Sequence, residues 1–122
     1  ATNENDILAR TLSTGCYELR GVKATQSPSM DIQVSSNFER LLFDAYLRDA
    51  GAIRNLMARL DQSKAFDIAA QPLAAIRADF DAASVNEQET AAEIARVYRA
   101  SGYILDPHSA VGVAASAWAL AS

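Results

Sequence analysis

Apolar positions recur with helical spacing over most of the chain from residue 36 onward. Phe38, Leu41 and Leu42 begin one such stripe, which continues to Ala45 and Tyr46. Serine followed three residues later by glutamate, at Ser36 and again at Ser84, predicts a capping box at a helix start. Together these signals predict helices over residues 36–46, 52–60, 72–80, 84–101 and 110–121.

The first 35 residues have a different pattern. Apolar residues on one face predict a short helix over residues 5–12, capped by Asn5 or Asp6 and stopped at Gly15. Residues 16–35 are broken by glycine, proline and small polar side chains, so we expect an extended or irregular segment.

A few short runs favour strands over helices. Residues 17–19 and 31–34 alternate between apolar and polar side chains, which is typical of a strand or an extended loop. Residues 103–105 are apolar and follow Gly102, a pattern that predicts a short buried strand. The fold class predicted from the residues is therefore mainly α, with one or two short strands. Residues 1–122 form one segment, with an irregular lead over 1–35 and a helical part over 36–122.

Composition limits what such a chain can do. It has 122 residues, of which 25 are alanine, so the core is modest for the 50% apolar content. The net charge is −4 and the eleven basic residues are scattered, which argues against a nucleic-acid partner. No apolar run is long enough to form a helix that spans a membrane, so we expect no membrane partner.

The termini and the cysteine content bear on location. Cys16 is the single cysteine, which excludes a disulfide framework and favours a cytoplasmic location. The chain begins at Ala1 without methionine and without a signal-peptide pattern. This start leaves open that the chain is cut from a longer protein.

The turn before the last predicted helix carries most of the candidate chemistry. His108 is the only histidine, so no histidine cluster can hold a metal. Its simpler role is that of a turn residue whose imidazole hydrogen-bonds to the backbone. Asp106 can orient that imidazole or cap the helix. Ser109 can also act as a cap, or its hydroxyl can face a ligand at a strand-to-helix turn.

A second candidate site lies at the start of the helix predicted from residue 36. Free N–H groups there can hold a phosphate, and Arg40 would strengthen such a site beside Asn37. The alternative is that the residues at this helix start only cap the helix and that Arg40 is solvated. Neither Lys23 nor Lys64 has a setting that marks a reactive amine. The residues themselves therefore predict neither a metal site nor a complete catalytic group.

Three blocks resemble threonine synthase, and they follow the order of that family. They are Thr-Gln-Ser-Pro-Ser-Met-Asp-Ile at 25–32, Ser-Ser-Asn-Phe-Glu-Arg-Leu-Leu-Phe at 35–43, and Gly-Tyr-Ile-Leu-Asp-Pro-His-Ser-Ala-Val-Gly at 102–112. Residues 1–6 also look like the strand-to-helix passage that precedes these blocks. The resemblance covers only the C-terminal part of that enzyme.

The resemblance implies a pyridoxal-phosphate enzyme related to the tryptophan synthase β-subunit. Such an enzyme has an α/β fold and converts O-phospho-L-homoserine and water to L-threonine and phosphate. Its Schiff-base lysine and its Ser-Gly-Asn-Phe-Gly phosphate loop lie upstream of the resembling part. We therefore expect the isolated chain to be inactive, to retain no pyridoxal phosphate, and to pack on a missing N-terminal part of the same enzyme.

The resemblance also assigns roles to single residues. Ser109 stands where the family often has threonine, whose hydroxyl is expected to bond the pyridine nitrogen of the cofactor. A neutral hydroxyl does not hold that nitrogen protonated, so the ring would be a weaker electron sink. Asp106 and His108 would be scaffold for the turn. Asn37 and Arg40 are typical of the family, which assigns them no contact here, and we expect them to bind the substrate phosphate at this helix start. No catalytic residue is expected in this segment.

Two other functions compete with this interpretation. The amphipathic helices also suit an autonomous helical interaction domain without catalytic activity. A small acid–base enzyme using Asp106 and His108 is a further alternative, although no nucleophile stands at a recognisable spacing from them.

Overall fold

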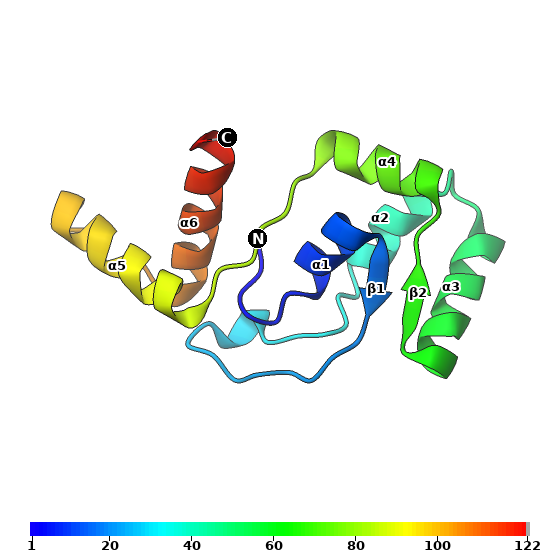
Figure 1. Cartoon of the computed structure of the whole chain (residues 1–122), viewed down its shortest axis with the longest axis horizontal. Helices are drawn as coiled ribbons and strands as arrows, with labels where there is room; N and C mark the ends of the chain where they lie inside the picture. Colours follow the sequence, from blue (N-terminus) through cyan, green and yellow to red (C-terminus); the bar gives the residue numbers. More distant parts are fainter. Residues whose placement is uncertain (122) are drawn as a thin grey trace.

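The computed structural model describes residues 1–121, and it has two groups of elements (Figure 1). Helices α5 (Glu87–Ser101) and α6 (Pro107–Ala121) pair with each other at one end, close to the short 3-10 helix η1 (Pro28–Met30). The other group holds the antiparallel strands and the remaining helices: β1 (Cys16–Glu18), β2 (Ala65–Asp67), α1 (Ile7–Thr14), α2 (Phe38–Ala45), α3 (Ala50–Ser63) and α4 (Ala70–Asp79). The predicted fold class, mainly α with one or two short strands, is confirmed. Among residues 1–121, every helix falls short of the length and apolar character needed to cross a membrane.

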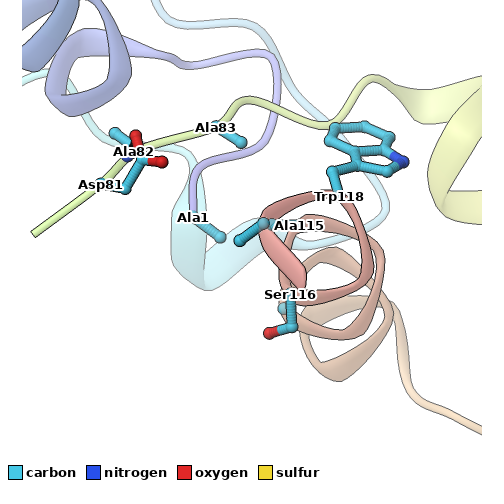
Figure 2. A pocket seen from close by; sticks show the side chains of 9 residues that line it. Ala1, Asp81, Ala82, Ala83, Ala115, Ser116 and Trp118 are labelled. Carbon is cyan, nitrogen blue, oxygen red and sulfur yellow. Dashed lines mark hydrogen bonds between the residues drawn. The ribbon is translucent and has the colours of Figure 1, made fainter. Parts of the chain in front are cut away.

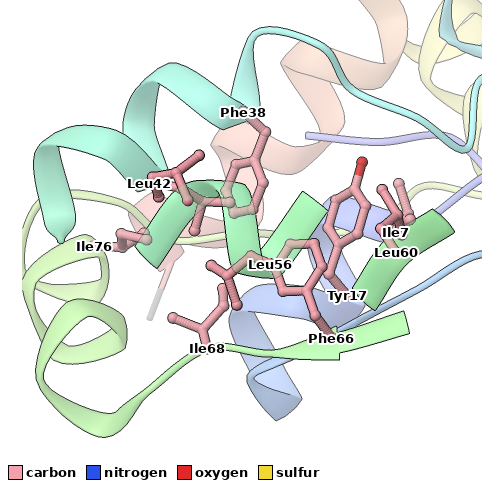
Figure 3. Packing of buried hydrophobic residues seen from close by; sticks show 10 residues of the cluster. Ile7, Tyr17, Phe38, Leu42, Leu56, Leu60, Phe66, Ile68 and Ile76 are labelled. Carbon is pink, nitrogen blue, oxygen red and sulfur yellow. The ribbon is translucent and has the colours of Figure 1, made fainter. Parts of the chain in front are cut away.

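The main core lies around the two strands (Figure 3). Tyr17 pairs with Phe66 across the sheet, and their rings stack with centroids 5.0 Å apart. Tyr17 also stacks on Phe38 of α2 at 5.6 Å, so three aromatic rings join the sheet to a helix. Aliphatic side chains from the surrounding helices complete this core: Ile7, Leu42, Ile53, Leu56, Leu60, Ile68 and Ile76.

A smaller apolar cluster holds α6 to the rest of the chain. Val85, Val111 and Ala114 are its buried centre, and Met30 of η1 packs against them. The N-terminal residue Thr2 forms an isolated parallel bridge with Ser84 beside this cluster. The α5–α6 pair is thus attached through segments that are distant in sequence.

A buried polar network joins the start of the chain to the loop before η1. Asn3 has no exposed surface, and its amide Nδ2 donates to Asp31 Oδ1 at 2.8 Å and to Ser27 Oγ at 2.9 Å. Asn5 Nδ2 also donates to Asp31 Oδ1, at 2.9 Å, and Thr25 Oγ1 does so at 2.6 Å. These hydrogen bonds, with that of Thr25 the largest contribution, hold the pKa of Asp31 below its usual value.

Several helix ends follow the predictions. Gly15 and Gly102 take left-handed conformations, with φ of 82° and 75°, directly after α1 and α5. Glycine is required at the first of these, because an added Cβ would also lie 2.9 Å from Leu73 Cδ2. Pro72 lies in the first turn of α4, as predicted.

The predicted helix starts were less accurate. Neither Asn5 nor Asp6 caps α1 with its side chain, because the Asn5 amide is held by the buried network and Asp6 accepts from Arg10 Nε at 2.8 Å. The capping box predicted at Ser36 is also wrong. Here α2 begins at Phe38, whose N–H donates to the carbonyl of Ser35 in a backbone turn.

The second predicted capping box exists, but two residues later. Asn86 accepts from the N–H of Glu89 at 2.7 Å, and the Glu89 carboxylate accepts from the N–H of Asn86 at 3.0 Å. In the bridge that pairs Thr2 with Ser84, the N–H of Thr2 donates to the Ala83 carbonyl and the N–H of Val85 donates to the Thr2 carbonyl. This stretch is therefore paired with the N-terminal segment, and α5 starts only after it. This displacement could not be seen from local sequence.

The strand predicted near residues 103–105 is wrong. This segment has no regular structure, and Tyr103 and Ile104 are 65% and 74% exposed. The only sheet in residues 1–121 is the β1–β2 pair, so no neighbouring strand is present to bond this segment. The apolar pattern of residues 103–105 predicts burial, but Tyr103 and Ile104 lie on the surface of this structure.

Candidate functional site

The sequence-predicted residues Asp106, His108 and Ser109 lie together at the start of α6. The helix begins at Pro107, so the irregular segment 103–106 leads directly into its first turn. Asp106 precedes the helix and accepts from the N–H groups of His108 and Ser109 at 3.0 and 3.1 Å. Asp106 is therefore the helix cap, one of the two roles considered for it.

Ser109 is bonded to the same carboxylate through its side chain. Its Oγ donates to Asp106 Oδ1 at 2.6 Å, so the carboxylate accepts a hydroxyl on one oxygen and two backbone N–H groups on the other. These bonds keep the pKa of Asp106 below its usual value, with the Ser109 hydroxyl as the largest cause. Ser109 is exposed, so a ligand can reach Oγ from outside the turn.

His108 joins this turn to η1. Its Nε2 accepts from the N–H of Ser29 at 3.1 Å, and its Nδ1 faces Asp106 Oδ2 at 3.4 Å. An accepting Nε2 carries no proton, so this hydrogen bonding assigns the proton of the neutral ring to Nδ1, on the Asp106 side. The imidazole thus bridges two segments 79 positions apart, as a scaffold residue would.

The other predicted pair, Asn37 and Arg40, lies on α2 and not on this turn. Both side chains are exposed, and Asn37 makes no side-chain cap bond. Arg40 lines an open surface hollow of about 680 Å³ together with Glu39, Asp44 and Arg48. No hydrogen bond or ion pair within residues 1–121 links this hollow to the α6 turn.

Another hollow lies along the C-terminal half of α6 (Figure 2). It has a volume of about 510 Å³ and is lined largely by alanines, with Trp118 and Gly112 on the helix side. Asp81 supplies the single charged side chain of this lining. None of the predicted site residues lines the hollow, so it is a separate apolar surface.

The chemistry at the α6 turn fits one part of pyridoxal phosphate. Ser109 Oγ is an exposed hydroxyl that can hydrogen-bond a ring nitrogen, and without a ligand it donates to Asp106. Neither lysine belongs to this turn: Lys64 caps α3, and Lys23 lies in the loop that Asn5 contacts. Within residues 1–121, no three histidine, cysteine or acidic side chains are grouped to hold a metal.

Sequence reasoning missed the partner of the histidine and the polar network next to it. Ser29 lies in the resembling block 25–32, but its hydrogen bond uses the backbone, which the side-chain pattern does not report. Asn3 and Asp31 are both in segments that resemble the family. The amide residues Asn3 and Asn5 beside an irregular segment with Asp31 were the available signal, since such groups need hydrogen-bond partners where they are buried.

Comparisons with known proteins agree with the three resembling blocks. The threonine synthase of Pseudomonas aeruginosa is 45% identical over 116 residues, which is 95% of this chain and 25% of that enzyme. The crystal structure of pyridoxal-phosphate-bound threonine synthase from Brucella melitensis superposes on 95% of this chain, with a TM-score of 0.94 and 59% identity. The chain is homologous to threonine synthase.

The match is to a part of that enzyme. Yeast threonine synthase covers the whole chain with a TM-score of 0.94 and 38% identity, and the chain covers 27% of it. The chain therefore spans about a quarter of the length of the threonine synthases it matches. This agrees with the C-terminal portion of a threonine synthase fold, as the resemblance implied. No protein-family model matches the chain.

Proposed function

We propose that this chain forms the C-terminal part of an active site that converts O-phospho-L-homoserine and water to L-threonine and phosphate. The observation that carries the proposal is the 59% identity and TM-score of 0.94 with a pyridoxal-phosphate-bound threonine synthase. When bound, pyridoxal phosphate supplies an electron sink for carbanion chemistry. The part of the site contributed here is the turn before α6.

Ser109 is the residue proposed to contact the cofactor. Its Oγ lies on an exposed first turn, where a hydroxyl can hydrogen-bond the pyridine nitrogen, and it is held by Asp106 in this structure. Asp106 and His108 keep the turn in shape through the backbone N–H groups of α6 and of Ser29. Because Ser29 belongs to η1 and bonds His108, the position of η1 affects the turn that holds Ser109.

The isolated chain is proposed to be inactive and to hold no pyridoxal phosphate. Lys23 and Lys64 are exposed and neither belongs to the α6 turn, and the five glycines are scattered. These residues offer no anchor for the aldehyde and no loop for the phosphate of the cofactor. Both would come from the remaining three quarters of the enzyme.

That remaining part is also the proposed packing partner. Tyr103, Ile104 and Leu120 are exposed by 65%, 74% and 87%, and they flank the two ends of α6. The adjacent exposed side chains of Tyr103 and Ile104 are the kind of apolar surface that another segment can cover. The alternative, an autonomous interaction domain, would use the same groups. We further propose a cytoplasmic location, since a single cysteine is typical of a reducing compartment.

The central test is a chimeric enzyme. In this carrier enzyme, the chain replaces the matching quarter of the Brucella melitensis threonine synthase. We expect it to release phosphate from O-phospho-L-homoserine and to form threonine, while the isolated chain does neither. A carrier enzyme that folds and binds pyridoxal phosphate but forms no threonine would contradict the proposal. The same remainder without this chain is the control, and we expect no activity from it.

Asn37 and Arg40 are proposed to contact the substrate phosphate. The positive end of the α2 dipole and the exposed guanidinium favour an anion, while Glu39 and Asp44 in the same hollow weaken that attraction. Arg40→Ala in the carrier enzyme should raise the KM for O-phospho-L-homoserine about fivefold, since an exposed charge pair contributes up to ~1 kcal/mol. Arg54→Ala, an exposed arginine on α3, is the matched control. Equal KM values for the two variants would remove Arg40 from the substrate site.

A further inference from the structure

We propose that residues 81–85 are a docking edge for a β-strand that directly precedes Ala1 in the full-length enzyme and pairs with them in parallel. The inference rests on the part of the proposed function in which the rest of the enzyme packs on this chain. It adds which segment packs here, in which register, and with what side-chain chemistry. Two features carry it: a parallel bridge that ends after one residue pair, and two apolar hollows that meet at Ala1.

The bridge between Thr2 and Ser84 is one pair of a parallel β-ladder. The N–H of Thr2 donates to the Ala83 carbonyl at 3.0 Å, and the N–H of Val85 donates to the Thr2 carbonyl at 2.8 Å. Thr2 thus bonds the residues on both sides of Ser84, which is the hydrogen-bond pattern of parallel strands. Phe80, where α4 ends, also has extended backbone angles, with φ of −129° and ψ of 141°.

The next position of this ladder is open. Shifting the pattern back by two residues on both segments pairs Ala82 with the residue directly before Ala1. In that register the Ala83 N–H donates to the carbonyl of the preceding residue, whose own N–H donates to the Asp81 carbonyl. Within residues 1–121, neither the Ala83 N–H nor the Asp81 carbonyl has a hydrogen-bond partner. A preceding strand would satisfy both groups.

Apolar hollows border Ala1 on the side of α6 and on the side of α1. The hollow along α6, of about 510 Å³, is lined by Ala1, residues 81–83 and Trp118 (Figure 2). A second hollow, of about 230 Å³, is lined by Ala1, Phe80 and apolar side chains of α1, α2 and α4. Figure 1 shows the N-terminus between α6 and α1. Trp118 and Phe80 are 42% and 52% exposed, so each hollow has an aromatic side chain left to cover.

These two hollows determine the chemistry of the strand. Side chains alternate between the two faces of a strand, so a strand continuing from Ala1 between the hollows would place apolar surface against both faces. Parallel strands that are buried on both faces are near-continuous runs of valine, isoleucine and leucine. We therefore expect such a run directly before Ala1. Proline at the position before Ala1 would overturn the register, because proline has no N–H for the Asp81 carbonyl.

The preceding segment is favoured over a second copy of the chain as the occupant of this edge. The chain matches the C-terminal quarter of longer threonine synthases, so a preceding segment belongs to the full-length enzyme. That segment is joined covalently to Ala1, next to the open position, and therefore has a high effective concentration there. A second copy would have to reach the same edge from solution.

A disulfide in the carrier enzyme tests the register. Cysteine at the position directly before Ala1 is combined with Ala82→Cys, and the enzyme is oxidised mildly. Paired strands lie about 4.8 Å apart, within the range of Cα distances that a disulfide can bridge. We expect a disulfide within one chain, identified by mass spectrometry of the peptides. Ala83→Cys with the same added cysteine is the matched control. Its side chain points to the opposite face, so we expect about tenfold less disulfide.

Hydrogen exchange of the unsubstituted carrier enzyme, followed by NMR, gives a second measurement that needs no variant to fold. We expect the Ala83 amide to exchange about 100-fold more slowly than the amide of the exposed Gly21, and at a rate similar to that of the bonded Val85 amide. Exchange at Ala83 as fast as at Gly21 would overturn the inference. Equal disulfide yields for the two cysteine pairs, or a disulfide between two copies, would do the same.

The outcomes separate this inference from the proposed function. A carrier enzyme that forms the expected disulfide and protects Ala83 but makes no threonine would retain the strand and contradict the activity. A carrier enzyme that makes threonine without the disulfide would retain the activity and overturn the strand. Circular dichroism of each cysteine variant reports whether its helices are retained.

Discussion

Replacing Asn3 by alanine is expected to lower the free energy of unfolding of this chain by about 3 kcal/mol. The side chain is fully buried, and its amide donates to Ser27 and Asp31 while its Oδ1 accepts the N–H of Asn5 at 2.9 Å. Alanine would remove the bonds to Ser27 and Asp31 and would leave the N–H of the buried Asn5 without its acceptor. Urea unfolding followed by circular dichroism measures the loss.

Asn37→Ala is the matched control for this prediction. Asn37 is exposed, and its side chain makes no cap bond, so its loss should change the free energy of unfolding by less than ~0.5 kcal/mol. Similar losses for the two variants would show that the network around Asn3 does not stabilise the fold.

The same network predicts how stability depends on pH. The pKa of Asp31 is lower in the folded chain than its ordinary value, so the folded state binds fewer protons than the unfolded state. The resulting stabilisation is fully present above the unfolded pKa of ~3.9 and is lost as the pH falls through the folded pKa. Asn3→Ala removes one of the donors to Asp31, so the difference between the variant and the unsubstituted chain should shrink below about pH 4. A constant difference across this range would argue against the role of Asp31.

Ser109→Ala in the carrier enzyme is expected to reduce the rate of threonine formation about 10- to 100-fold. The variant removes the proposed hydrogen bond to the ring nitrogen, and a hydrogen bond to a charged group contributes about 1.5–3 kcal/mol. It also removes the 2.6 Å bond that orients the turn through Asp106. Phosphate release under saturating substrate measures the effect.

Two variants control for damage to the helix. Ser109→Thr keeps the hydroxyl and should keep most of the rate, since the family often has threonine at this position. Ser116→Ala removes an exposed serine from the same helix and should leave the rate unchanged. Full activity in Ser109→Ala would exclude Ser109 from the cofactor site without affecting the homology of the chain.

Local features of the site and the fold were predictable from sequence. Asp106 and Ser109 are three residues apart at a helix start, where the backbone geometry brings a side-chain oxygen to N–H groups of the first turn. Gly15 and Gly102 end helices because glycine accepts a positive φ at little cost. Such features depend on a few neighbouring residues, and the sequence contains all of them.

Predictions that required knowledge of burial were less reliable. The apolar run at Tyr103 and Ile104 was interpreted as a strand, but it is exposed and has no partner strand within residues 1–121. Ser84 has the pattern of a helix cap, yet its backbone pairs with Thr2 and the helix starts later. At Ser84 the pairing with Thr2 decided the local structure. At residues 103–105 the absence of a partner strand within residues 1–121 decided it.

By itself, then, the sequence determined the mainly helical fold class, several helix ends, the resemblance to threonine synthase and a capping role for Asp106 as one of two alternatives. Only the tertiary structure decided that Ser29 bonds His108 and that Asn3 and Asp31 share a hydrogen-bond network. The physical reason is the range of the interactions. Contacts within a helical turn follow from local backbone geometry, whereas contacts between distant residues depend on the path of the whole chain.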